Sequence, residues 1–505
     1  MSIATLVTFS IYFVVVLAVG WYCCRKNESI EDYLLGGRRM GALVTAISAE
    51  ASDMSGWLLM GLPGAIYLGG TKSIWIAIGI FVGTILNWVL VAGRLRVYTH
   101  KTNAITLPRF LEERFGDPTG LLRTLSAVVI LVFFTIYTSS GLVAAGKLFE
   151  STFGTPYWTS VVIGGAVTIG YTLMGGYFAV CWTDVVQGML MVFALVVVPS
   201  VACLRSGGVG AVGAAMAQKG LQTALIPDWT GATLLGIVSA TAWGLGYFGQ
   251  PHILVRFMSV KSLAKLRESM VIAILWVLVS LAGAVTIGLV GVGMFENLSG
   301  GEEEKVFIYM VNRVIHPLLA GTMLAAIMAA IMSTIDSQLL VSSSALTEDL
   351  PCKGSAGASM RRTTFWGRAC VVVISILAMA LALHPNETIL GIVAYAWGGF
   401  GAAFGPLVLF ALFSRRTTWV AALLGMLAGT VVLVAWKQMG LSEHMYEIVP
   451  GFVANTLVML VVNRVTQQAN VRVLQQFDEV TRELRNVGRQ APAPQASYGA
   501  GDGQA

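Results

Sequence analysis

Long runs of apolar residues separated by short polar connections dominate the chain. A run of about 20 apolar residues is what an α-helix needs to cross the hydrocarbon core of a bilayer. By this criterion the sequence predicts thirteen spans, at residues 3–23, 41–67, 73–93, 122–146, 157–178, 182–204, 230–250, 269–295, 307–346, 365–383, 388–413, 417–436 and 447–463. The runs do not alternate with period two, which excludes a β-barrel. We therefore expect an all-α integral membrane protein.

Composition agrees with this pattern and narrows the function. The 505 residues are 56% hydrophobic and 11% charged, against about 25% charged in soluble domains. The net charge of +6 does not indicate a nucleic-acid partner, because the basic residues lie in the connections between spans. The six cysteines include no CxxC pair, so neither a zinc site nor a disulfide framework is indicated.

Lysine and arginine are divided unequally between alternate connections. One set of connections carries 25 of the 32 basic residues and the other carries 7. Because basic connections stay in the cytoplasm, we expect an odd number of spans in the plasma (inner) membrane, with the N-terminus outside and the C-terminus cytoplasmic. The first segment, Ile3–Cys24, has no cleavage motif and is expected to remain as an anchor.

The predicted span 41–67 is interrupted at mid-depth. Glu50 and Asp53 are costly in a bilayer and must face protein or water. Gly56, Gly61 and Pro63 loosen the helix nearby. An opened helix exposes carbonyl and amide groups, which is tolerated where they bind a ligand. The alternative is a merely kinked helix with paired acids.

A second interruption lies in the span 230–250. Glycines alternate with aromatic residues there, and Pro251 closes the stretch. Trp243 and Tyr247 are four residues apart and would share one face of an α-helix. Such pairs are commonly core packing, but the adjacent break favours a ligand pocket.

The span 307–346 contains a cluster of side-chain oxygens at Ser333, Thr334 and Asp336. Serine and threonine in a span often bond the carbonyl four residues earlier. Hydroxyls together with freed carbonyls are also the ligands that suit a dehydrated sodium ion. Tyr137 could complete a pocket or simply pack, and Asp184 could cap the helix predicted at 182–204.

The chain contains no GxxxxGK[ST], HExxH, GxSxG or CxxC motif. Neither an ATP-driven pump nor a membrane enzyme is therefore supported. We expect transport driven by an ion gradient.

Four stretches, residues 52–65, 243–251, 332–340 and 393–406, resemble the sodium/solute symporter family, in particular members that carry proline. The resemblance covers residues 29–451. It implies a leucine-transporter-like fold with two inverted five-helix repeats and two discontinuous helices. The implied division is 1–40 (extra helix and loop), 41–204 (first repeat), 205–413 (second repeat), 414–463 (two further helices) and 464–505 (cytoplasmic tail).

The resemblance also implies site residues. The sodium ligands would be the carbonyls of Ala51, Met54 and Ala330 and the hydroxyls of Ser333 and Thr334. The proline pocket would comprise Ser55, Trp57, Gly61, Tyr137, Trp243, Tyr247 and Pro251. Asp53, Arg38 and Asp184 match residues tied to coupling. Glu50 stands where a member of the family has glycine, and Asp336, which we add to the coupling group, stands where it has serine.

The function implied is sodium-coupled import of L-proline by alternating access. The same fold serving another amino acid, pantothenate or a monocarboxylate is one alternative, and a solute sensor is another. In the tail, residues 464–489 predict an amphipathic helix followed by disorder to residue 505. That helix could bind a partner or pack on the cytoplasmic face or lipid surface, and no obligate protein partner is evident.

Overall fold

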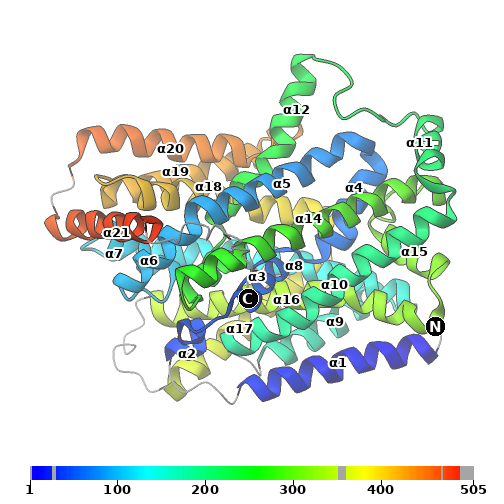
Figure 1. Ribbon diagram of the computed structural model, residues 1–505, viewed down its shortest axis with the longest axis horizontal. Coiled ribbons are helices and arrows are strands. Elements are labelled where there is room, and N and C mark those ends of the chain that lie inside the picture. Colours follow the sequence, from blue (N-terminus) through cyan, green and yellow to red (C-terminus); the bar gives the residue numbers. More distant parts are fainter. Residues whose placement is uncertain (1–2, 25–29, 174–175, 351–359, 468–469, 490–505) are drawn as a thin grey trace, which may run out of the picture.

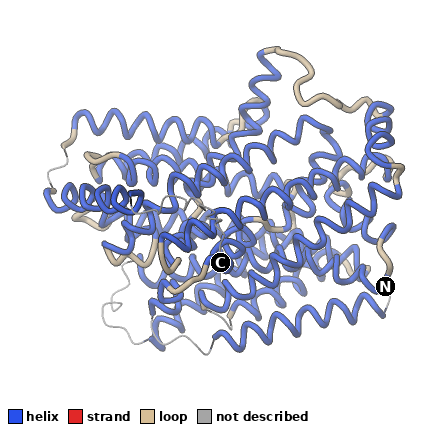
Figure 2. The backbone as a smooth tube through the Cα atoms, viewed as in Figure 1, coloured by secondary structure: helices blue, strands red, loops and turns tan. Residues whose placement is uncertain are grey.

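The structure is a computed structural model that describes residues 3–24, 30–173, 176–350, 360–467 and 470–489. These residues are helical and form no strand (Figure 2). The α-helices are α1 (Ile3–Cys24), α2 (Ile30–Leu35), α3 (Ala42–Asp53), α4 (Leu62–Gly69), α5 (Ile74–Leu86), α6 (Gly93–Lys101), α7 (Leu107–Phe115), α8 (Leu121–Phe153), α9 (Tyr157–Thr172), α10 (Tyr177–Arg205), α11 (Gly208–Gln218), α12 (Gly231–Thr241), α13 (Pro251–Ser259), α14 (Leu263–Met294), α15 (Val306–Val314), α16 (Pro317–Ser344), α17 (Met360–Ala382), α18 (Ile389–Phe413), α19 (Trp419–Gln438), α20 (Ile448–Val465) and α21 (Val471–Arg489). The 3₁₀ segments are η1 (Gly36–Arg38), η3 (Gly70–Ser73), η5 (Ala242–Gly249), η6 (Glu303–Lys305) and η8 (Leu441–Glu443), and the π-helical turns are η2 (Trp57–Gly61), η4 (Asn87–Ala92) and η7 (Ala345–Asp349).

Eleven helical stretches in the described residues are long and apolar enough to cross a membrane. The all-α membrane architecture is thus confirmed, whereas the count of thirteen spans stays a prediction. Two features account for the difference. The apolar part of α9, Tyr157–Gly170, is shorter than a full span, and Trp57–Lys101 counts as one stretch although Gly70, at φ 62°, turns the chain between α4 and α5.

The core is built around two helices. In α16 and α18, 83% of the most apolar stretch is buried, against 28% in α1 and 22% in α20. The first half of the interrupted span, α3, packs between α10, α14 and α16 and also contacts α13. The central helices are therefore enclosed by protein, and the peripheral ones leave apolar side chains for lipid.

The two sets of basic connections lie at opposite ends of the helix bundle. In Figure 1, α2, α6, α7 and α21 gather at the left end, whereas α11, α15 and the start of α1 lie at the right. At the left end Lys101 pairs with Glu479 at 2.6 Å, and at the right end Lys305 pairs with Glu150 at 3.3 Å. This segregation is what the alternating charge pattern requires.

Two predicted spans have different limits in the structure. The span 307–346 is divided into α15 and α16, because Ile315 and His316 are extended and Pro317 starts a new helix. The span predicted at 182–204 begins earlier, at Tyr177, after the extended residue Gly176.

The amphipathic helix in the tail begins later than predicted, since α20 continues to Val465 and α21 starts at Val471. Its apolar face packs on this chain, against α6 and α7, and buries Val473 and Val480. Packing on the end of the bundle is therefore confirmed as the position of this helix. Residues 490–505, expected to be disordered, lie outside the described residues.

Candidate functional site

The first predicted helix break is present between α3 and η2. Met54 leaves the helix with φ −85° and ψ 81°. The amide of Ser55 then donates to the carbonyl of Asp53 at 3.0 Å, not to that of Ala51 as a continuous helix would require. The break therefore frees the Ala51 carbonyl from its helical donor.

The freed carbonyl faces α16. The Ser333 hydroxyl lies 2.7 Å from the Ala51 oxygen and 3.1 Å from that of Ala330. The adjacent Thr334 hydroxyl is buried with no hydrogen-bond partner, and Met54 is fully buried at the break. Three of the five predicted sodium ligands thus touch one another, and neutral oxygens of this kind suit a hard monovalent cation.

The second predicted break is also present, in a different form from that expected. Residues Ala242–Gly249 form the 3₁₀ segment η5, Gln250 is extended, and Pro251 begins α13. Trp243 and Tyr247 therefore do not share one α-helical face, since a 3₁₀ helix aligns residues three apart. That prediction was wrong.

What joins these two rings is Trp397 of α18. Its ring centroid lies 6.5 Å from that of Trp243 and 5.0 Å from that of Tyr247. Its indole also donates to the Trp243 carbonyl at 2.8 Å. A Cβ at Gly246 would collide with the Trp397 indole, which explains the glycine at this point of η5.

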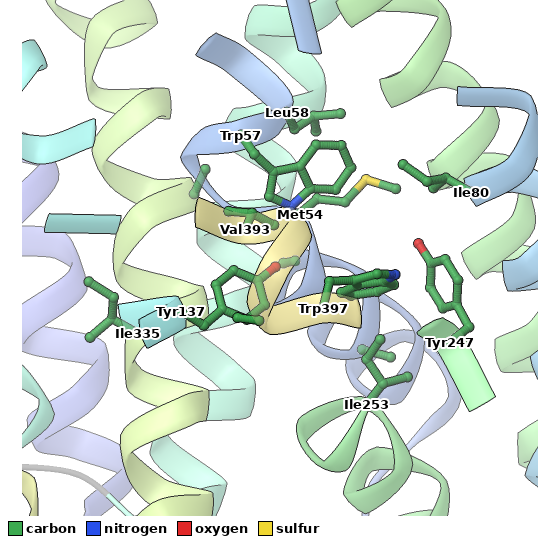
Figure 3. Packing of buried hydrophobic residues seen from close by; sticks show 14 of the residues in the cluster. Met54, Trp57, Leu58, Ile80, Tyr137, Tyr247, Ile253, Ile335, Val393 and Trp397 are labelled. Carbon is green, nitrogen blue, oxygen red and sulfur yellow. The ribbon is translucent and has the colours of Figure 1, made fainter. Parts of the chain in front are cut away.

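Aromatic side chains from both breaks converge. Figure 3 shows Trp57, Tyr137, Trp397 and Tyr247 arranged around Met54. The rings of Trp57 and Trp243 are 6.3 Å apart. The result is a wall of large rings with exposed backbone beside it, suited to a small solute that has both apolar and charged parts.

Asp53 connects the two broken helices. Its carbonyl accepts hydrogen bonds from the Trp57 indole at 3.1 Å and from the Tyr137 hydroxyl at 3.3 Å. Its carboxylate accepts one from the Tyr247 hydroxyl at 2.5 Å. A change at either break is therefore transmitted through this residue.

The remaining predicted pocket residues lie at the two breaks or near them. The Ser55 hydroxyl accepts from the Trp57 amide at 3.5 Å. A Cβ on Gly61 would lie 3.2 Å from that of Leu390, so this glycine serves close packing of η2 on α18. Pro251 is buried as the first residue of α13.

Arg38 of η1 lies at the left end of the bundle in Figure 1, away from the aromatic cluster. Its guanidinium donates to the carbonyls of Met258, Thr99 and Ala104 at 3.3, 3.2 and 2.8 Å. It also pairs with Glu31 at 3.0 Å. Partial burial lowers the pKa of Arg38 from its ordinary value. These contacts tie α13 to the end of α6.

Asp184 does not cap its helix, as had been considered, because α10 begins seven residues earlier at Tyr177. It is buried and pairs with Arg256 at 3.3 Å, while Ser48 of α3 donates to it at 2.6 Å. Asp336 is also buried and accepts a hydrogen bond from Thr172. These acids belong to a buried polar network around Arg256.

Sequence reasoning missed two residues of this region. Trp397 sits in the middle of the glycine-rich stretch 393–406, so its composition could have revealed it. Arg256 looked like a topology signal in a connection, but its side chain is fully buried. No sequence signal separates a buried arginine from an exposed one at such a position.

Comparisons with known proteins agree with this geometry. The chain is 46% identical over 467 residues to the high-affinity proline transporter PutP of Bacillus subtilis (strain 168), covering 92% of this chain and 98% of that protein. It is 45% identical over 489 residues to the sodium/proline symporter of Escherichia coli (strain K12), covering 95% and 97%.

Two solved structures share the fold. A substrate-bound, outward-open Na⁺-coupled sialic acid symporter superposes with a TM-score of 0.78 at 18% identity, covering 92% of this chain and 98% of that chain. MhsT in complex with L-phenylalanine gives a TM-score of 0.56 at 13% identity, covering 84% and 98%. The leucine-transporter-like fold is thus confirmed. The model of one family, described as the sodium:solute symporter family, matches residues 33–429, and this chain belongs to that family.

Proposed function

We propose that this protein imports L-proline together with sodium across the plasma membrane by alternating access. The observation that carries the proposal is the near full-length identity of 46% and 45% to proteins named as proline transporters. Membership of a family of transporters also argues against an enzyme. The two helix breaks and the aromatic cluster between them fit the proposal.

Sodium would bind between α3 and α16. Its ligands would be the carbonyls of Ala51, Met54 and Ala330 and the hydroxyls of Ser333 and Thr334. Two of these contacts already join the helices, through the 2.7 Å approach of Ser333 to Ala51. An ion at this place would stabilise the form in which α3 and α16 are together, and so complete the neighbouring solute site.

Proline would bind beside the ion. Its carboxylate suits the start of η2 at Ser55 and Trp57, where amide groups are directed away from the first half of the helix. Its ring suits the aromatic surface of Trp57, Tyr137, Trp243 and Tyr247. Gly61 and Pro251 would act through the backbone, by letting η2 approach α18 and by starting α13 at the break.

Contacts at both ends of the bundle fit alternating access. At the right end in Figure 1, Glu304 pairs with Lys147 and accepts from the Ile389 amide at 2.7 Å, joining η6, α8 and α18. At the left end Arg38 holds α13 against α6. We assign the left end to the cytoplasm because it carries the larger basic set.

The coupling residues lie between the sodium site and this end. We propose that Asp53 links the ion to the solute pocket, and that Asp184 and Asp336, with Arg38, link it to the cytoplasmic closure. The inverted repeats would comprise residues 41–204 and 205–413.

Uptake of labelled proline into proteoliposomes tests the function. An inward sodium gradient should drive accumulation, and equal potassium or proton gradients should not. A membrane potential of about 100 mV gives ~2.3 kcal/mol per sodium ion, and a tenfold gradient adds ~1.4 kcal/mol. Accumulation of several hundredfold is therefore attainable with one ion.

The same assay separates the alternatives. Excess unlabelled amino acids, pantothenate or lactate that compete where proline does not would replace the substrate. Binding of proline without any uptake would favour a sensor. Within the described residues the tail offers only one helix, α21, as a signalling element.

A further inference from the structure

Glu50 is a buried acid with an unused oxygen. It lies on α3 one turn before Asp53, and its side chain is 1% exposed. One carboxylate oxygen accepts a hydrogen bond from the Trp88 indole at 2.8 Å, whereas the other has no partner. The proposed sodium and proline sites do not use this side chain.

Asp53 repeats this arrangement. One of its carboxylate oxygens accepts from Tyr247 at 2.5 Å, and the other is buried without a partner. The two acids are three residues apart, which places them on the same face of α3. They are also close enough to interact electrostatically. Two unused acidic oxygens therefore occupy one enclosed region between α3, η4 and η5.

The surroundings of this region supply polar groups but no positive charge. None of the ion pairs between described side chains includes Glu50 or Asp53. Asn87, which precedes Trp88, is 1% exposed, and both polar atoms of its amide lack partners. Asn87 starts the π-helical turn η4, and such turns are frequent at functional sites.

Charge balance shows what is missing. Buried charges persist when they are paired or bind a cation. The proposed sodium site has five neutral ligands, so its ion balances only one of the two carboxylates. Each acid also receives one hydrogen bond, from Trp88 or from Tyr247, which favours the charged form. One negative charge remains to be compensated.

We propose that Glu50 and Asp53 hold a second sodium ion, so that two sodium ions enter with each proline. This inference rests on the proposed function. The ion would use the unpartnered oxygens of Glu50 and Asp53, and it would lie on the face of α3 that looks toward η4 and η5. The first sodium site lies on the face that looks toward α16.

Stoichiometry in proteoliposomes is the test. The measurements are ²²Na⁺ and ³H-proline uptake in the same vesicles, the charge moved per proline, and the Hill coefficient for sodium. For the unmodified protein we expect two sodium ions and two charges per proline and a Hill coefficient near 2. For Glu50→Gln we expect one, one and near 1, with proline still transported. Glu50→Asp should keep two ions at weaker affinity, and Glu303→Gln, a buried acid outside this region, should resemble the unmodified protein.

Each other result decides the matter. One sodium ion and one charge per proline in the unmodified protein would overturn the proposal, even if no variant folds. Two charges with only one sodium ion would assign a proton instead and also overturn it. Two sodium ions in Glu50→Gln would remove Glu50 from the site. Proline uptake that needs no sodium would reject the proposed function itself, which is a separate outcome.

Discussion

The hydroxyl of Ser333 on α16 lies 2.7 Å from the carbonyl of Ala51 on α3, at the point where α3 stops being a helix. A hydroxyl from another helix has replaced the missing amide donor. The same two groups are sodium ligands in the proposed mechanism, so an ion entering here would exchange this hydrogen bond for coordination. Opening and closing of the contact between α3 and α16 would then depend on sodium.

Replacing Ser333 by alanine should therefore weaken sodium binding. A polar contact with a charged group contributes about 1.5–3 kcal/mol, which corresponds to tenfold or more in affinity. We expect the sodium concentration for half-maximal proline uptake to rise by about tenfold or more. Sodium titrations of initial uptake rates in proteoliposomes measure this value.

Ser344→Ala is the matched control on the same helix. Its hydroxyl bonds the Val341 carbonyl of its own helix at 2.7 Å and reaches no other element. This variant should keep the original sodium dependence. If Ser333→Ala and Thr334→Ala both keep it as well, the proposed ion shell is wrong.

Trp243→Phe should weaken apparent proline affinity. The indole is 6.3 Å from the ring of Trp57 and 5.5 Å from that of Tyr446, so a smaller ring loosens both contacts. Aromatic pairs of this kind contribute about 0.5–1.5 kcal/mol each. We expect the KM for proline to rise roughly three- to tenfold. Trp229→Phe, at a position 76% exposed, is the control and should leave the KM unchanged. An unchanged KM in both variants would move the solute away from Trp243.

The helix breaks could be predicted because their causes are local. Acids, glycines and prolines at mid-depth of an apolar run cannot be accommodated by a continuous helix facing lipid. The oxygen cluster at Ser333 and Thr334 was visible for the same reason. The structure then showed that Ser333 touches Ala51, a contact between residues 282 positions apart.

Features that depend on distant contacts could not be predicted in this way. The 3₁₀ form of η5 follows from its close packing on α18, where Trp397 donates to the Trp243 carbonyl. The burial of Arg256 depends on Asp184, which lies on another helix. Periodicity within one segment carries no information about such partners.

Asp184→Ala should destabilise the fold strongly. It would leave the fully buried Arg256 without its only acidic partner among the described ion pairs. Removing one member of a buried pair typically costs 3–5 kcal/mol. Thermal unfolding in detergent should show a clear fall in Tm. The double variant Asp184→Leu with Arg256→Met should recover part of the loss, because no unpaired charge is left. A double variant less stable than Asp184→Ala would mean that the pair itself contributes little.

Gly249→Ala should also destabilise the protein. A Cβ at Gly249 would lie 2.9 Å from the amide nitrogen of Gly405 and would also collide with the Phe400 backbone, and backbone cannot move aside as a flexible side chain can. Overpacking of this kind typically costs 1–3 kcal/mol. Gly236→Ala is the matched control, since nothing lies within 4 Å of a Cβ there and alanine favours the helix. Equal Tm values for the two variants would show that α18 does not press on η5 at this glycine.

Acid should loosen α21 from the end of the bundle. Asp478 accepts two hydrogen bonds of 2.8 Å from Arg415, and Glu479 pairs with Lys101 at 2.6 Å. These partners lower the pKa of both carboxyls below their ordinary values. A lowered pKa in the docked form means that the stabilisation is present above the ordinary pKa and is lost as pH falls through the lowered one. We expect hydrogen exchange of the amides in α21 to accelerate below about pH 4, relative to the intrinsic rate at each pH. Asp478→Asn should accelerate it already at pH 7, whereas Glu483→Gln, which lacks an ion pair in the described residues, should not. Exchange that is equally slow at both pH values would mean that the buried face at Val473 and Val480 holds the helix without help from these charges.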